Sequence, residues 1–143
     1  MKNKISIILI LIFILLLAIL LVNIQQFQRE ELKSATIIMM AKQWRFEIVN
    51  HTGILKYEYI SIGETRANLT IWISKNTIVI MKIKSIDVVH GIGMEGYPVM
   101  TILPPNEEIK IKFLADKIGK FKFYCTVFCG TGHPDHIGYL IVI

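Results

Sequence analysis

The sequence predicts an all-β sandwich or barrel that follows one apolar N-terminal helix, and three observations support this prediction. Hydrophobic residues make up 53% of the 143 residues, and they concentrate in an 18-residue run at positions 5–22 whose only polar member is Ser6. The rest of the chain consists of short segments in which apolar and polar residues alternate, as they do in half-buried strands. Turn-forming residues separate these segments, which is typical of sandwiches and barrels.

The apolar run comes first in the chain. As a helix, residues 5–22 would be about 27 Å long, just enough to cross the hydrocarbon core of a membrane. A cleaved signal peptide is the alternative, because Lys2 and Lys4 form a short positive segment before the run. The run is long for a signal peptide, however, and no small-residue cleavage site follows it. We therefore expect a retained transmembrane anchor with its linker at residues 1–33.

The two lysines also predict an orientation. Positive charge before the anchor favours a cytoplasmic N-terminus, so the chain would be a single-pass protein of the cell membrane. The domain at residues 34–143 would then lie on the outer, extracytoplasmic face.

Strand signals follow the anchor. Strict alternation of apolar and polar residues, or a high content of β-branched residues, predicts strands at residues 78–84, 107–113, 120–124 and 139–143. Weaker candidates are residues 36–49, 55–62, 69–74 and the strand-like 85–89. Turn formers lie between them at Gly53, Gly63, 74–76, 91–96, 104–106 and Gly119.

The charge of the chain excludes one class of function. The net charge is +5, and from Ser34 onward 12 Lys/Arg stand against 9 Asp/Glu. The lysines are dispersed at alternating positions, which is typical of solvated strand faces rather than of a nucleic-acid surface. We therefore expect no nucleic-acid partner.

The chemistry is concentrated near the C-terminus. Both cysteines and two of the four histidines lie at Cys125, Cys129, His133 and His136, in a loop between two predicted strands. Thiolates together with imidazoles select copper or zinc. Three intervening residues let a tight turn direct both sulfurs to one point, where His133 can join them. His90 ends a strand-like segment, and strand ends far apart in sequence can meet at one pole of a sandwich.

Three interpretations of this cluster remain open from the residues alone. Two cysteines outside the cytoplasm form a disulfide by default. Two cysteines and two histidines also fit tetrahedral zinc. A mononuclear blue copper site needs only one cysteine, so a second thiolate points to two metals that share sulfur ligands.

A family resemblance extends these observations. His90, followed 35 residues later by C-x-x-x-C-G-x-G-H, resembles the CuA signature of cytochrome c oxidase subunit II. The segments 43–47, 87–96, 103–105, 119–125 and 132–138 resemble further parts of that subunit, so the likeness spans nearly all of residues 36–143. One anchor in place of two resembles the short subunit II of the B-type oxidases.

The resemblance implies a cupredoxin-like Greek-key fold that holds a dinuclear copper (CuA) cofactor. Cys125 and Cys129 would bridge the two coppers, His90 and His133 would each bind one, and the backbone carbonyl of Val127 would be a weak ligand. Trp44 would receive the electron from the donor. No residue would be catalytic, because the oxygen chemistry of the family belongs to another chain.

Two positions depart from the family pattern. The usual methionine ligand three residues after the last histidine is replaced by His136. We expect His136 to bind copper in its place; the alternative is that it turns outward and pairs with Asp135. Position 127 is Val where many members have a glutamate that reaches a magnesium ion. Valine has no ligand atom, so we expect that magnesium site to be absent or built otherwise.

The function that the resemblance implies is electron transfer. The chain would accept electrons from an external donor, either cytochrome c or a small blue copper protein, and pass them to haem in subunit I of a haem–copper terminal oxidase. The alternative is a copper-free structural subunit II of a quinol oxidase, in which the ligands are lost.

Overall fold

The structure is a computed structural model that describes residues 2–28, 33–61 and 67–143. It divides into two compact units, Met1–Glu31 and Leu32–Ile143. The first unit contains the helix α1 (Lys2–Gln28), whose described side chains are exposed. Predicted features at the linker residues 29–32, at Ile62 and at the Gly63 turn lie outside the described residues.

The prediction of a transmembrane anchor is corrected in part. A helix does form over the predicted residues. Among the residues that the structure describes, however, no helix is both long and apolar enough to cross a membrane.

The second unit is built from strands. Their bounds are β1 (Lys33–Lys42), β2 (Arg45–Thr52), β3 (Lys56–Ser61), β4 (Ala67–Ile73), β5 (Thr77–Ser85), β6 (His90–Met94), β7 (Val99–Leu103), β8 (Glu108–Ala115), β9 (Gly119–Tyr124) and β10 (Ile137–Val142). One 3-10 turn, η1 (His133–Asp135), lies between β9 and β10.

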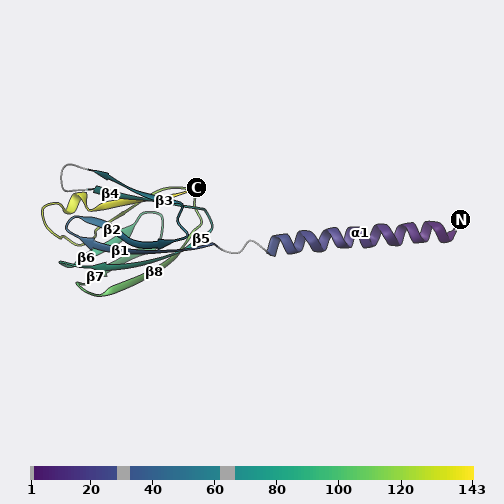
Figure 1. Cartoon of the computed structure of the whole chain (residues 1–143), viewed down its shortest axis with the longest axis horizontal. Helices are drawn as coiled ribbons and strands as arrows, with labels where there is room; N and C mark the ends of the chain where they lie inside the picture. Colours follow the sequence, from purple (N-terminus) through teal and green to yellow (C-terminus); the bar gives the residue numbers. More distant parts are fainter. Residues whose placement is uncertain (1, 29–32, 62–66) are drawn as a thin grey trace. The chain divides into compact units, whose positions relative to one another are not determined.

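These strands form two packed sheets (Figure 1). One sheet has the order β2-β1-β5-β8 and the other the order β3-β4-β10-β9-β6-β7. The pairs β1–β5 and β10–β4 are parallel, and the other paired strands are antiparallel. The described domain is therefore a mostly β sandwich, as predicted, and the alternative of a closed barrel is wrong.

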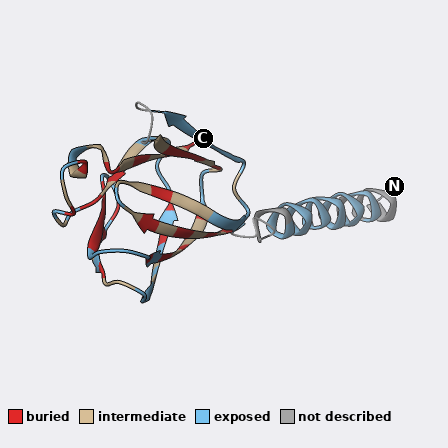
Figure 2. Ribbon diagram, turned by 60° about the vertical axis from the view of Figure 1, so that its left-hand side comes forward, coloured by how far each residue is buried: buried red, intermediate tan, exposed pale blue. Residues whose placement is uncertain are grey.

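The core lies between the sheets. Alternate residues of β1 and β5 face inward and are fully buried, and residues of β4, β9 and β10 face them from the other sheet. Figure 2 shows this alternation of buried and more exposed residues along the strands. Met39 and Met81 belong to this core. Burying an aliphatic or aromatic side chain contributes about 1.5–3 kcal/mol, so the alternating pattern is enough to set the face of each strand.

Three local predictions need correction. Residues 36–49 form two strands rather than one, because the chain turns at Gln43 and Trp44. Residues 86–89 are not a strand. The carboxylate of Asp87 accepts hydrogen bonds from the backbone N–H groups of Gln43 and Val88, and such bonds compete with strand pairing.

The third correction concerns residues 91–96, which the sequence predicts as a turn. Gly91 and Gly93 lie instead within β6, and both are buried. A Cβ atom would lie 2.1 Å from Thr126 Oγ1 at Gly91 and 2.9 Å from Thr126 Cγ2 at Gly93. The glycines therefore allow the backbone of β6 to approach the loop that carries the cysteines.

Candidate metal centre

Three segments that are far apart in sequence meet at one end of the sandwich. His90 begins β6, residues 125–136 connect β9 to β10, and Gln43 and Trp44 form the turn between β1 and β2. Because β10, β9 and the antiparallel β6 are neighbours in one sheet, the loop after β9 emerges beside the start of β6. A hydrogen bond from Cys125 N to the carbonyl oxygen of His136 (3.0 Å) closes the base of the loop.

The two cysteine sulfurs lie at the centre of this meeting point. Cys125 Sγ and Cys129 Sγ are 3.8 Å apart, and both residues are buried free cysteines. A disulfide requires about 2.05 Å between the sulfurs. The structure therefore places the pair as two thiols that point to a common space, and not as the disulfide that the sequence leaves open.

Two buried histidines complete a compact group, which we call the inner quartet: His90, Cys125, Cys129 and His136. His90 Nδ1 is 3.7 Å from Cys125 Sγ, and His136 Nδ1 is 3.7 Å from Cys129 Sγ. The four ligand atoms all lie within 4.8 Å of one another. This His/Cys/Cys/His cluster is compatible with copper binding.

Two further predicted ligands lie beside the sulfurs, and we call them the outer pair: the imidazole of His133 and the backbone carbonyl of Val127. His133 Nδ1 is 3.6 Å from Cys129 Sγ. The carbonyl oxygen of Val127 is 3.1 Å from Cys125 Sγ. The structure thus brings together all six of the groups that the sequence singles out as metal ligands.

The two thiols have very different pKa values. Burial opposes ionisation of Cys125, but hydrogen bonds from His136, His90 and nearby backbone groups outweigh it and lower its pKa to about 4. Burial and the charge of Cys125 raise the pKa of Cys129 to about 12. The metal-free pair therefore holds one negative charge at neutral pH, and the second thiolate requires a compensating cation.

Asp87 orients His90. Its carboxylate oxygen Oδ1 is 2.7 Å from His90 Nε2, and its oxygens also accept the backbone bonds from Gln43 and Val88. Burial raises the pKa of Asp87, but these three bonds outweigh it, so the net effect is a lowered pKa and a charged carboxylate at neutral pH. In the neutral tautomer that keeps its proton on Nε2 and donates it to Asp87, Nδ1 is the nitrogen that could bind a metal ion.

His136 is held by different means. Its side chain is fully buried, and the ring of Phe46 packs against it with 4.2 Å between ring centroids. The ring of His90 is its other aromatic neighbour, at 4.9 Å. Its Nε2 has no hydrogen-bond partner among the described residues. Apart from its contacts with the two cysteine sulfurs, this imidazole is held by ring packing rather than by a carboxylate.

The turn between β1 and β2 touches the same loop. Trp44 Nε1 and Gln43 Nε2 both donate to the carbonyl oxygen of Cys129. The indole of Trp44 covers Gly132, where a Cβ atom would lie 2.3 Å from Trp44 Cδ2. Trp44 is half-buried. The structure thus places the predicted electron acceptor residue in contact with the cysteine loop, although its role stays a prediction.

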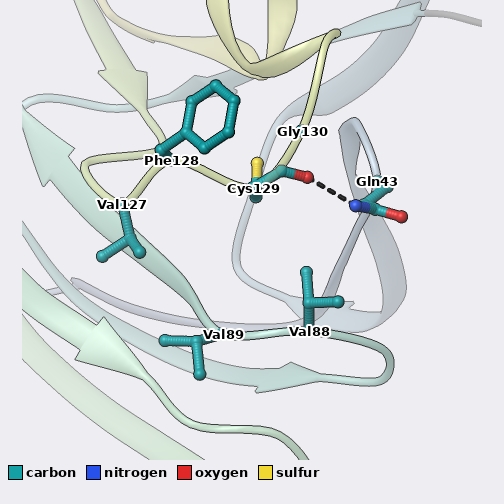
Figure 3. A pocket seen from close by; sticks show the side chains of 7 residues that line it. All are labelled: Gln43, Val88, Val89, Val127, Phe128, Cys129 and Gly130. Atoms are coloured by element: carbon teal, nitrogen blue, oxygen red, sulfur yellow. Dashed lines mark hydrogen bonds between the residues drawn. The ribbon is translucent and has the colours of Figure 1, made fainter.

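A shallow, mostly apolar hollow lies next to Cys129. Figure 3 shows its lining, in which Val88, Val89, Val127 and Phe128 surround Cys129 and the hydrogen bond from Gln43. The side chain of Val127 lines this hollow and supplies no ligand atom. Phe128 is 78% exposed at its rim.

Sequence reasoning assigned no role to Asp87, to the side chain of Gln43 or to Phe46. An Asp three residues before a predicted histidine ligand is a signal that could have found Asp87, because metal-binding histidines usually donate their second nitrogen to a carboxylate or carbonyl. The contact of Phe46 with His136 comes from packing between the two sheets, because Phe46 lies on β2 of one sheet and His136 directly precedes β10 of the other. No local pattern in the sequence shows it.

Known proteins share parts of this sequence. No protein-family model matches the chain. Cytochrome c oxidase subunit 2 of Thermus thermophilus is 30% identical over 64 residues, which make up 45% of this chain and 47% of that protein. The chain thus matches less than half the length of this curated relative. Nitrous-oxide reductase of Ralstonia nicotianae is 38% identical over 56 residues, or 39% of this chain and 9% of that protein.

Solved structures show the same fold. The periplasmic domain of cytochrome oxidase subunit II (CoxB) of Bradyrhizobium japonicum superposes with a TM-score of 0.60 at 18% identity, covering 76% of this chain and 83% of that one. A chain of a heme-copper terminal oxidase dimer has a TM-score of 0.57 at 21% identity, with full coverage of both chains. Auracyanin A, a blue copper protein of Chloroflexus aurantiacus, has a TM-score of 0.51 at 16% identity.

Cytochrome c oxidase subunit 2 proteins are thus among both the sequence relatives and the structural neighbours of this chain, and its fold matches the cupredoxin domain that carries the CuA site in that subunit, as the resemblance in the sequence predicts.

Proposed function

We propose that this chain is the electron-accepting subunit of a haem–copper terminal oxidase and that it holds a dinuclear CuA site. The observation that carries the proposal is the pair of free sulfurs 3.8 Å apart, with imidazole nitrogens 3.6–3.7 Å away on both sides. The chain would take electrons from cytochrome c or a small blue copper protein and pass them to haem in subunit I.

The residues present fit two copper ions. One ion would take the inner quartet as its ligands, and the other would take the same two sulfurs together with the outer pair. Thiolate and imidazole suit copper, and the Val127 carbonyl adds a weak ligand. When bound, such a copper pair supplies reversible one-electron chemistry with the unpaired electron shared between the two ions.

The protein's own contribution is to hold these ligands in advance. Cys125, Cys129, His90 and His136 are at most 4% exposed, so water is largely excluded from the sulfurs. The Asp87 hydrogen bond fixes His90, and Phe46 packs on His136. Ligands that are fixed by the fold move little when the charge of the centre changes, which favours fast electron transfer.

Trp44 would be the residue through which the electron arrives. Trp44 is half-buried, and its Nε1–H donates to the carbonyl of Cys129. This hydrogen bond links the indole to a residue whose sulfur would bind both coppers. The contact supports the proposed role of Trp44.

The proposed location is the outer face of the cell membrane. The solved neighbour from Bradyrhizobium japonicum is a periplasmic domain of an oxidase subunit. By analogy, the described domain of this chain would receive electrons outside the cytoplasm and would meet subunit I at that face of the membrane. The cytoplasmic position of the N-terminus stays a prediction from its two lysines.

The test is copper loading of the full chain after reduction. We expect two coppers per chain by elemental analysis and an electron paramagnetic resonance spectrum in which one unpaired electron is shared by both ions. One copper with an ordinary four-line spectrum, or no bound copper at all, would contradict the dinuclear site. In the second case the copper-free structural subunit of a quinol oxidase becomes the better proposal, although the presence of all the ligand groups argues against it.

A further inference from the structure

We propose that the inner quartet is a self-sufficient tetrahedral site that takes one zinc-like or cuprous ion before, and independently of, any second metal. The inference rests on the proposed metal site, but it does not require that two ions ever bind together. It states which part of the site binds the first ion, and it states that zinc competes with copper there.

The distances within the inner quartet fit a single ion. With metal–sulfur bonds of about 2.3 Å and metal–nitrogen bonds of about 2.0–2.1 Å, the ligand atoms of a tetrahedral site lie roughly 3.3–3.8 Å apart. In the inner quartet the two sulfurs are 3.8 Å apart, and each histidine nitrogen is 3.7 Å from a sulfur. The remaining separations are at most 4.8 Å, so small side-chain movements would close the tetrahedron.

The ligands of the inner quartet also bind soft or borderline metal ions more strongly than those of the outer pair. The quartet offers two thiolates and two imidazoles, which is the ligand set of closed structural zinc sites. The outer pair offers one imidazole and one neutral carbonyl oxygen. A carbonyl is a poor ligand for a soft or borderline cation. The first ion should therefore occupy the inner quartet, and the outer pair should bind only an ion that can share both sulfurs.

The inner quartet is more enclosed than the outer pair. His90 and His136 are fully buried, and the cysteines are 4% exposed. His133 of the outer pair lies at intermediate depth. Exchange of an ion in the inner quartet should consequently be slow, because both imidazoles must leave packed positions before the ion can escape.

His136 is the residue that creates this property. With methionine at position 136, the family's usual residue, the site would keep only three ligands that zinc prefers, and its fourth would be a thioether. The imidazole of His136 replaces that weak ligand with a strong one. The imidazole that would bind copper at position 136 would thus also make the inner quartet bind zinc tightly.

The experiment titrates cobalt(II), a spectroscopic substitute for zinc, into the metal-free, reduced full chain and then displaces it with zinc. We expect one equivalent with the intense visible bands of tetrahedral thiolate coordination. His136→Met should weaken this binding more than about 100-fold, the upper end of the loss seen when only an outer-shell partner is removed. Thr131→Ala, at an exposed position of the same loop, is the matched control and should leave the affinity unchanged. His133→Ala tests the outer pair, since His133 Nδ1 lies 3.6 Å from Cys129 Sγ, and it should weaken cobalt binding far less than His136→Met.

Circular dichroism of each variant checks folding, and His90→Asn removes a quartet ligand from another strand if His136→Met does not fold. The inference is overturned if His133→Ala weakens cobalt binding as strongly as His136→Met, or if two equivalents bind with equal affinity. Copper loading separates this outcome from the proposed function. If the cobalt titration overturns the loading order and copper loading still gives two coppers with a shared electron, the proposed function stands and only the inference falls. One tightly held zinc with no second copper would leave the inference standing while the proposed function falls.

Discussion

The two histidines of the inner quartet occupy equivalent positions but are held by opposite means. Both are fully buried, and each places Nδ1 3.7 Å from one of the two sulfurs. His90 is fixed by a hydrogen bond to the charged Asp87, whereas His136 is fixed by the packing of Phe46. A hydrogen bond positions the ring of His90 and close packing positions the ring of His136, yet both rings place Nδ1 at the same distance from a sulfur. Different substitutions should therefore displace the two rings.

Phe46→Ala should remove the packing that holds His136. We expect it to have the largest effect on both stability and metal affinity. Loss of a fully buried phenylalanine destabilises a core by about 3–5 kcal/mol, and here the cavity would also free the His136 ring. Urea unfolding of the metal-free chain measures the first effect, and cobalt titration measures the second. Phe113→Ala, a core change next to Tyr97, is the control. It should cost comparable stability without changing cobalt affinity, and an equal loss of affinity in both variants would contradict a specific role for Phe46.

Asp87→Asn should weaken the hydrogen bond that orients His90. Removing the charge beside His90 Nε2 makes the imidazole a poorer ligand, and loss of such a partner typically lowers metal affinity by about 10–100-fold. Competition with a chelator of known affinity measures the change. Asp116→Asn is the matched control, because Asp116 is an exposed carboxylate outside the site. An unchanged affinity in Asp87→Asn would mean that packing also determines the position of His90.

Gln43→Ala should have a smaller effect. The substitution removes one of two donors to the Cys129 carbonyl while Trp44 Nε1 remains in place. One neutral hydrogen bond contributes about 0.5–1.5 kcal/mol, so we expect metal release to a chelator to speed up by less than about tenfold. The backbone N–H of Gln43 still donates to Asp87 in this variant, so the His90 side is preserved. If Gln43→Ala released metal to the chelator faster than Asp87→Asn, the expected ranking of the two substitutions would be wrong.

Glu95→Gln sets the baseline for a surface change. Glu95 pairs with Lys122 at 3.1 Å, but both side chains are largely exposed. Such pairs contribute about 0–1 kcal/mol, so neither the free energy of unfolding nor cobalt affinity should change measurably. A clear loss of affinity here would show that the assay responds to general destabilisation.

The sequence was a good guide to the parts of the site that are local in the chain. Alternation predicted the sandwich, and the spacing of Cys125 and Cys129 predicted two sulfurs at one point. The resemblance to a known family predicted that His90, His133 and His136 would approach them, and the structure brings all three within 3.7 Å of a sulfur. Their roles as ligands stay predictions.

The parts that the sequence did not predict depend on contacts across the fold. Gly91 and Gly93 look like a turn until Thr126 is known to lie against them. The division of the histidines into His136 of the inner quartet and His133 of the outer pair depends on the short turn η1, which no spacing rule specifies. Residues 86–89 have strand-like composition, but the side-chain bonds of Asp87 prevent a strand there.

No described residue hydrogen-bonds to Nε2 of His136, and this unsatisfied atom lowers the stability of the metal-free protein. A buried polar atom without a hydrogen bond costs about 1–3 kcal/mol, and no metal bound at Nδ1 removes that cost at Nε2. The protein is therefore less stable both with and without a bound metal, because it keeps a ligand that functions only when an ion is bound. In this sense His136 is an example of a trade between function and stability located at a single nitrogen atom.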